Sequence, residues 1–367
     1  MRPAPLALLV VSVAGALAGC GGGREPSPPA SAKLTASGED AAPAQLTVRQ
    51  AIGQHMVFAY SGLQPPAALK KRIARGEAAG VVLFARNIRS VAQVKAQIAA
   101  LQRIERPPAV DAPLLVMVDQ EGGTVRRLPG PPRTGAAQTP TVAAARANGH
   151  AAGVLLRGAG VNVDFAPVLD VARPGAALER EGRAYGRAAK VVTAKAGAFA
   201  AGLRAASVEP VFKHFPGFGA ATINTDDGAA RVDLTLSQLR ATDLAPYRAL
   251  RPGAIMLSTA VYPRIDPRPA AFSRRWVTTE LRERMGFGGI TITDDLQASA
   301  VATFGSPSQL AYFALRAGVD LPLFAQTYEA GARAAAGLER AVTSNALPRG
   351  QLDEGVRRLL RWRIGLG

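Results

Sequence analysis

The 367-residue chain has a single cysteine, Cys20, and only three histidines. A lone cysteine excludes an internal disulfide. The histidines and the cysteine do not form the clusters that bind metals in proteins, so we expect neither a metal site nor any other cofactor. Aromatic residues make up only 5% of the chain, so the core must be built mainly from Ala, Val, Leu and Ile.

Acidic residues are also scarce, with 27 of them against 44 basic residues and a formal net charge of +17. Such a basic chain raises nucleic acid as a partner. The basic residues are scattered singly through helix-like segments, however, and no basic run is interleaved with aromatic residues. We therefore expect no nucleic-acid partner, whereas non-specific attraction to an anionic cell wall is compatible with the charge.

The apolar run "LALLVVSVAGALAG" near the N-terminus is too short to indicate a membrane span and is typical of a secretory signal. It ends in "LAGC" (17–20), which resembles the lipobox of bacterial lipoproteins, in which the cysteine becomes the lipidated first residue. Residues 1–19 are therefore predicted to be a lipoprotein signal peptide, and Cys20 to anchor an exported protein to the outer face of the cytoplasmic membrane. The alternative is a plain secretory signal with an incidental cysteine.

Residues 20–45 are dominated by Gly, Pro, Ser and Ala, which indicates a flexible tether before a single domain at 46–367. In that domain, apolar β-rich runs alternate with helix-like segments, which predicts βαβ units and a parallel sheet. Eight runs favour a closed (β/α)₈ barrel of the TIM type as the catalytic domain. The predicted strands are 52–60, 80–85, 113–119, 161–171, 208–213, 254–259, 289–295 and 318–324.

Apolar residues at three- and four-residue spacing predict helices between these strands. A doubly wound open sheet is the competing fold, and it usually carries a glycine-rich phosphate turn after its first strand. Here "GEAAGVV" precedes a strand instead of following one, which favours the barrel. The clearest predicted helices are 91–104, 189–206, 274–285, 306–317 and a last helix at 351–364.

Charged residues follow several of the predicted strands. Active sites of β/α barrels lie at the C-terminal strand ends, so these residues are predicted to surround one pocket. The aspartates have an alternative role as caps of the following helices, which a Lys-His pair cannot fill. The strand-end residues are Asp119, Asp170, Lys213, His214, Asp294 and Asp295.

Several carboxylates with one lysine and one histidine, and no metal-binding cluster, suit a polyhydroxylated substrate. Carboxylates and cations bind sugar hydroxyls through charge-assisted hydrogen bonds. An aspartate that is ionised at neutral pH can also attack an anomeric carbon. The residues therefore indicate a carbohydrate as the partner of this pocket.

Six motifs in order carry a resemblance that covers roughly Leu46 to Gly367. The chain resembles glycoside hydrolase family 3 and, within it, the single-barrel bacterial β-N-acetylhexosaminidases of cell-wall recycling. The resemblance implies a retaining glycosidase that acts on N-acetylglucosamine-containing glycans such as peptidoglycan fragments. The motifs are "GVVLFARNI" (80–88), "DQEGGTVRRL" (119–128), "VNVDFAPVLDV" (161–171), "GRAYG" (182–186), "KHFPGFG" (213–219) and "LRERMGFGGITITDDL" (281–296).

The resemblance also implies roles for individual residues. Asp294 in "TITDD" matches the nucleophile that forms the glycosyl-enzyme, and its neighbour Asp295 is assigned a supporting role, with helix capping as the alternative. A further set matches the residues that hold the sugar in the subsite before the cleaved bond, namely Asp119, Arg127, Arg183, Lys213 and His214.

The chain departs from the family pattern where the general acid/base belongs. The hexosaminidase branch has "KHFPGHG" followed by a mobile loop with an Asp-x-His dyad, whose histidine protonates the leaving oxygen. Here Phe218 replaces the motif histidine, and counting from Lys213 puts Asn224-Thr225-Asp226 at the dyad. A further family histidine, after strand six, corresponds to Thr259. The remaining histidines are far from this loop in sequence.

Two interpretations follow. In the first, Asp226, or failing that Asp227, replaces the histidine as general acid/base. A free aspartate titrates near ~3.9, so its pKa would have to be raised by burial or a nearby charge. In the second, the loop only covers the sugar, and the chain is an impaired hydrolase that binds glycans. A β-glucosidase-type hydrolase is the other alternative.

Overall fold

The computed structural model describes Met1 and residues 45–366. The predicted signal peptide and tether, with Cys20, lie outside the described part except for Met1 and Gln45. Seven parallel strands form one sheet, in which they pair in the order in which they occur in the sequence. These strands are β1 (Val57–Phe58), β2 (Gly80–Val82), β3 (Leu115–Val118), β6 (Val163–Asp164), β7 (Glu209–Phe215), β8 (Ala254–Leu257) and β11 (Ile290–Thr293).

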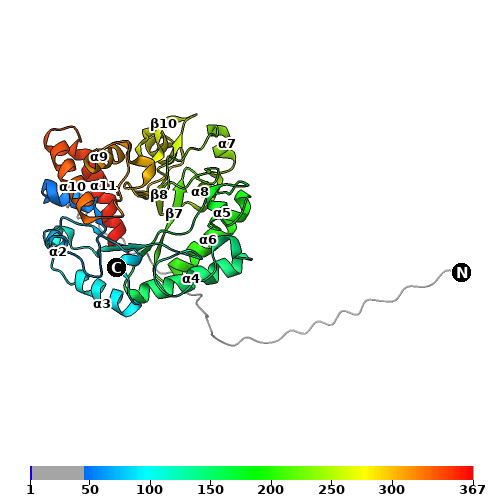
Figure 1. Cartoon of the computed structure of the whole chain (residues 1–367), viewed down its shortest axis with the longest axis horizontal. Coiled ribbons are helices and arrows are strands. Elements are labelled where there is room, and N and C mark those ends of the chain that lie inside the picture. The colour runs from blue at the N-terminus through cyan, green and yellow to red at the C-terminus, as the bar shows by residue number, and fades with distance from the viewer. Residues whose placement is uncertain (2–44, 367) are drawn as a thin grey trace. The chain divides into compact units, whose positions relative to one another are not determined.

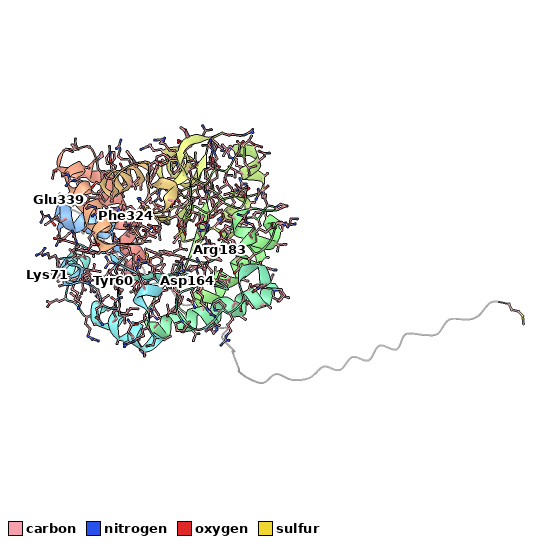
Figure 2. The ribbon with its side chains drawn as sticks, viewed as in Figure 1. Tyr60, Lys71, Asp164, Arg183, Phe324 and Glu339 are labelled. Atoms are coloured by element: carbon pink, nitrogen blue, oxygen red, sulfur yellow. The ribbon has the colours of Figure 1, made fainter. Side chains whose placement is uncertain are left out.

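The eighth predicted strand closes the ring between β11 and β1. It does so through isolated parallel bridges, from Leu321 to Ile292 and from Phe324 to Phe58, and Figure 2 labels Phe324. Pro322 lies between the two bridging residues and has no N–H to donate, which explains why no continuous strand forms here. The arrangement is the predicted (β/α)₈ barrel, with a seam of fewer backbone hydrogen bonds.

Hydroxyl groups of β11 complete this seam. Thr291 Oγ1 accepts the backbone N–H of Asp320, and Thr293 Oγ1 accepts that of Leu323, both at 2.9 Å. Side-chain acceptors thus take the place of the strand ladder where the backbone pairing is interrupted.

Helices surround the strands, as Figure 1 shows for α2, α3, α4, α6 and α8 to α11. Four of the five predicted helices agree with the structure to within two residues, and the fifth, 274–285, is a π-helix. The helices are α1 (Val48–Gln54), α2 (Ala67–Ala74), α3 (Val91–Gln102), α4 (Val142–Ala159), α5 (Ala177–Arg180), α6 (Ala189–Ala205), α7 (Leu236–Ala241), α8 (Ala245–Leu250), η6 (Arg275–Arg284), α9 (Pro307–Ala317), α10 (Tyr328–Thr343) and α11 (Arg349–Ile364).

The prediction of a strand over 52–60 was wrong for its first residues, because α1 extends to Gln54 and only Val57–Phe58 pair as a strand. Thr47 starts the helix by accepting the N–H of Gln50 in a capping box. The residues at the end of the helix and those of the strand are all buried. The hydrophobic pattern of this run therefore shows neither helical nor strand periodicity, and the boundary between the two elements cannot be predicted from it.

The side chains of the strands alternate between two cores. In β3, Leu115 and Met117 belong to a cluster inside the barrel, whereas Val116 and Val118 pack against the helices. Alternate residues of the other strands extend the inner cluster, which therefore fills the barrel centre.

Helix α11 closes the barrel at the N-terminal strand ends. Leu359 belongs to the inner cluster. The buried Arg363 donates from Nε to the carbonyl of Pro113 (3.0 Å), ahead of β3, and from Nη1 to Gln54 Oε1, ahead of β1. Ion pairing between Arg49 and Glu339 (labelled in Figure 2) further joins α1 to α10. Within the described part, every helix is too short or too polar to cross a bilayer.

Candidate active site

A cavity of about 260 Å³ opens at the C-terminal strand ends. Its floor includes Phe165, Met256 and Leu323, which are also members of the inner barrel cluster. Its polar lining contains all seven residues predicted to act in catalysis or sugar binding. These are Asp119, Arg127, Arg183, Lys213, His214, Asp226 and Asp294.

Lys213, near the end of β7, is the centre of a charged cluster. Its Nζ lies 2.7 Å from Asp119 Oδ1 and 2.7 Å from Glu121 Oε1. Burial lowers the pKa of Lys213, but the two carboxylates outweigh burial and raise the pKa overall. The ammonium therefore stays charged in a buried position, as expected for a group that donates to sugar hydroxyls.

Two arginines complete the cluster. Arg183 (labelled in Figure 2) donates from Nε and Nη2 to the two oxygens of Glu121 at 3.0 and 2.8 Å. Arg127 Nη2 lies 3.5 Å from Asp119 Oδ2. Burial raises the pKa of both carboxyl groups, but the neighbouring cations, Arg183 and Lys213 for Glu121 and Lys213 and Arg127 for Asp119, lower it overall. Both acids are ionised and paired.

His214 is held from behind by Asp170. The ring Nδ1 lies 2.7 Å from Asp170 Oδ2, and the same carboxylate accepts the backbone N–H groups of His214 and Phe218. This arrangement leaves Nε2 as the ring atom available to the cavity that His214 lines. Asp170 itself is fully buried and does not line the cavity. The prediction that Asp170 surrounds the pocket was therefore wrong, because its oxygens are engaged with the β7 turn.

Asp294 directly follows β11. Its Oδ1 accepts the N–H of Asp295 at 2.9 Å, and its Oδ2 lies 3.4 Å from the Thr225 hydroxyl. Asp295 is mostly occupied by structural bonds: its Oδ1 accepts the backbone N–H groups of Gln297 and Ala325, both at 2.9 Å. Burial raises the pKa of Asp295 to about 6. Because these donors belong to a turn and to the segment after the seam, Asp295 caps no helix here.

The loop predicted to carry the acid/base lies over this pocket. Asn224, Thr225 and Asp226 all line the cavity, and Asp227 does not. Asp226 is exposed on its outer side, yet partial burial against the cavity, followed by the charge of Asp294, raises its pKa. A raised pKa is the condition that a carboxylic acid must meet to donate a proton near neutral pH.

Three acidic residues near the site were missed in the sequence. Glu121 stands in the hairpin of β4 (Gln120–Gly122) and β5 (Val125–Arg126), two residues after a strand-end aspartate. Glu181 lies beside the "GRAYG" motif and lines the cavity. Asp164 (Figure 2) interrupts the apolar run of β6, which was a usable signal.

Asp164 differs from Asp119 and Glu121 because no cation is bonded to it. Its Oδ1 accepts the N–H of Gln120 at 2.9 Å, and its buried Oδ2 has no partner among the described residues. Burial raises its pKa to about 8. Asp164 is therefore protonated at neutral pH, unlike Asp119 and Glu121.

A second cavity, of about 310 Å³, lies away from this site near His55 and Arg358. Arg358 is paired there with the buried Asp320 at 2.8 Å, and His55 contacts backbone carbonyls. Among the described residues, the carboxylates, Lys213 and His214 that suit a sugar gather at the C-terminal strand ends and not in this second cavity.

Comparison with known proteins agrees with this geometry. Residues 44–362 match the family described as Glycosyl hydrolase family 3 N terminal domain. An "Uncharacterized secreted glycosyl hydrolase" of Arthroderma benhamiae is 40% identical over 285 residues, which cover 74% of this chain and 80% of that protein. A "Beta-hexosaminidase" of Xylella fastidiosa is 39% identical over 259 residues, 67% of this chain and 75% of that one.

A solved glycoside hydrolase family 3 beta-N-acetylglucosaminidase from Paenibacillus sp. superposes with a TM-score of 0.81 at 31% identity. The superposition covers 88% of this chain but 63% of the Paenibacillus chain, so this chain spans less than two thirds of that enzyme's length. With the family match across nearly the whole described barrel, and relatives of about 40% identity over most of it, the chain belongs to glycoside hydrolase family 3 and is a glycosidase that hydrolyses O-glycosyl bonds.

Proposed function

We propose that the chain is an exported, retaining β-N-acetylhexosaminidase that releases terminal N-acetylglucosamine from cell-wall-type glycans. Asp294 is the nucleophile and Asp226 the general acid/base in this proposal. The observation that carries it is that both carboxyl groups line one cavity with the five predicted sugar-binding residues. The names of the bacterial and structural relatives support the amino-sugar substrate.

In the first step, Asp294 attacks the anomeric carbon while Asp226 transfers its proton to the leaving glycosidic oxygen. The C–O bond to the leaving sugar breaks, and an ester forms between Asp294 and the retained sugar. In the second step, Asp226 takes a proton from water, which hydrolyses the ester and restores both carboxyl groups.

The electrostatic coupling of the two aspartates suits this exchange of roles. The charge of Asp294 contributes to the raised pKa of Asp226 in the free enzyme, which favours the protonated acid for the first step. Ester formation removes that charge, so the pKa of Asp226 falls and the ionised base is favoured for the second step.

The remaining residues bind the sugar. Lys213, Arg183 and Arg127 supply donors, and the paired Asp119 supplies acceptor oxygens, to hydroxyl groups that replace water in the cavity. His214 presents a ring whose orientation is fixed by Asp170. None of these residues needs to transfer a proton to the leaving group.

The test compares nitrophenyl N-acetyl-β-glucosaminide with nitrophenyl β-glucoside, with Asp294→Asn as the inactive control. We expect turnover of the first substrate, product of retained anomeric configuration, and a 2-fluoro sugar trapped on Asp294 by mass spectrometry. A preference for the β-glucoside would replace the amino-sugar assignment, and trapping on Asp295 would move the nucleophile. Sugar binding without any turnover would establish the glycan-binding alternative.

We propose in addition that Cys20 carries a lipid that anchors the exported protein outside the cytoplasmic membrane. The "LAGC" motif supports the anchor, and the word "secreted" in the name of the Arthroderma relative supports export. Cys20→Ala is expected to release the exported protein from the membrane fraction. Equal membrane association of the variant and the wild type would contradict a lipid on Cys20.

A further inference from the structure

Glu181 bonds to the loop and to the sugar-binding cluster at the same time. One oxygen, Oε2, accepts Nη1 of Arg183 at 3.1 Å, and the other, Oε1, accepts Nδ2 of Asn224 at 2.9 Å. Arg183 is in turn bonded to Glu121 through its other two donors. One carboxylate oxygen of Glu181 therefore bonds to its near neighbour Arg183, and the other bonds to Asn224, 43 residues away in the sequence.

Asn224 also forms hydrogen bonds with the backbone of the loop. Its Oδ1 accepts the N–H of Asp226 at 3.2 Å, and its carbonyl oxygen accepts the N–H groups of Asp227 and Gly228 at 3.0 and 3.2 Å. The conformation of the segment that presents Asp226 is thus organised around Asn224, whose side-chain amide is held by Glu181.

The position of Glu181 is fixed by its own helix. Its backbone N–H donates to Ala177 at the start of α5, and Ala177 N–H donates to Ala221 at the base of the loop. The Glu181 side chain is 32% exposed, so it lies at the cavity wall between solvent and the buried cluster. Because Glu181 accepts a hydrogen bond from Arg183, which lines the cavity, a sugar that binds to Arg183 can shift the Glu181 side chain.

From this geometry we infer that Glu181 is a positioning residue, which holds the Asn224–Asp226 loop over the cavity and couples its position to Arg183. This inference rests on the proposed function in assigning the acid to Asp226. Glu181 itself does not donate the proton, because both of its oxygens already accept hydrogen bonds. Sugar binding at Arg183 and delivery of the acid are linked through this one side chain.

The experiment measures amide hydrogen exchange of residues 221–229 in the purified full chain, together with turnover of a disaccharide and of a nitrophenyl glycoside. Glu181→Ala is expected to speed exchange in this segment about tenfold, since one of the tertiary bonds that hold the segment is lost. The same variant is expected to lose about tenfold in kcat on the disaccharide and much less on the nitrophenyl glycoside, which needs little protonation.

Matched variants sharpen the test. Glu179→Ala removes a glutamate of α5, two residues before Glu181, whose side chain bonds to Arg187 at 2.5 Å and to the N–H of Gly175 and not to residues 221–229; this variant is expected to behave as wild type. Glu181→Gln keeps an acceptor and is expected to lie between Ala and wild type. A Glu181→Ala/Asn224→Ala double variant is expected to lose less than the sum of the two single losses, because both single variants remove the bond between Glu181 and Asn224.

Wild-type exchange of residues 221–229 in Glu181→Ala would overturn the inference. Gln and Ala variants that are equally inactive, are rescued by azide and retain wild-type exchange would identify Glu181 as the acid and would also overturn it. If Glu181→Ala speeds exchange while Asp226→Ala retains full disaccharide turnover, the coupling by Glu181 stands and the assignment of Asp226 fails.

Discussion

The strand-end cluster and the loop above it are built by different means. Around Lys213, the buried charges are matched by opposite charges at hydrogen-bonding distance. The charged groups come from β7, from the residues that follow β3 and, for Arg183, from the segment between α5 and α6. Around Asp226, the loop is held by separate hydrogen bonds, such as Ala300 N–H to the Thr225 carbonyl and Asn224 to Glu181, and the loop partner in each is a neutral group. Asp226 and Asp227 both lie on the exposed side.

This difference indicates that sugar binding and proton transfer are carried out by separate parts of the site, the charged cluster and the loop. Binding a sugar requires fixed donors and acceptors, which a cluster of paired charges supplies without rearrangement. Transfer of a proton requires a group whose charge can change, and a cluster of matched ion pairs resists such change. The titrating group is therefore expected in the loop, and the following variants test that division.

The largest effect is expected for Asp294→Asn, the strand-end residue that contacts the loop through Thr225. The amide is nearly isosteric but cannot form the ester, so turnover of all substrates should fall by more than about 10⁴-fold while the fold is kept. Circular dichroism and thermal unfolding provide the control for the fold. Residual activity near that of the wild type would move the nucleophile elsewhere.

Asp226→Ala is expected to lose about 10²–10⁴-fold on a disaccharide, the range of general acid catalysis, and little on a nitrophenyl glycoside. Azide is expected to rescue the aryl reaction if deglycosylation limits it. The matched control is Asp227→Ala, which removes the neighbouring carboxyl group that does not line the cavity. Equal disaccharide activity of Asp226→Ala and wild type would contradict the assignment.

Lys213→Ala is expected to act in the opposite manner, with the same loss for every leaving group. Loss of a charged hydrogen bond to the sugar reduces kcat/KM about 10–100-fold. The variant also leaves Asp119 and Glu121 without their shared cation, so it should lower the free energy of unfolding by about 3–5 kcal/mol. Lys190→Ala, on the exposed face of α6, is the control. A loss confined to poor leaving groups would instead assign proton transfer to Lys213.

The smallest effect is expected for Asp164→Asn, which tests the buried acid whose Oδ2 has no partner among the described residues. The folded pKa is about 8, whereas an unfolded aspartate titrates near ~3.9. Between these values the folded protein keeps a proton that the unfolded chain releases, so the contribution of Asp164 to the free energy of unfolding is greatest below about pH 4 and is lost as pH rises toward 8.

Asn keeps an acceptor for Gln120 and does not ionise, so the variant removes this pH dependence. The difference in Tm between variant and wild type should be more positive at pH 8 than at pH 5, at about 2–4 °C for each kcal/mol. The same difference at both pH values would show that Asp164 has an ordinary pKa in the folded protein.

The sequence was sufficient to predict the barrel and the strand-end residues Asp119, Lys213, His214 and Asp294 of the cavity, because apolar strands that end in charged residues have one arrangement that buries the first and gathers the second. Arg127, Arg183 and Asp226 were predicted from the family resemblance alone. The sequence was not sufficient for Glu121 and Glu181. Loops and the hairpin after β3 bring these glutamates close to their partners, which include Lys213 and Arg183. The path of a loop cannot be predicted from hydrophobic periodicity. The role of Asp170 was misjudged for a similar reason, since its acceptors are satisfied by backbone groups of the β7 turn.

The closure of the barrel by α11 has a consequence for how the chain folds. The hydrogen bond between Gln54 and Arg363 joins residues 309 positions apart, and that between Leu46 and Arg349 joins residues 303 apart. Contacts of such long range must wait for nearly the entire domain to be available, and they slow the search for the native state. During synthesis, α1 and β1 are therefore expected to lack these contacts until α11 has emerged, so the barrel can close only late.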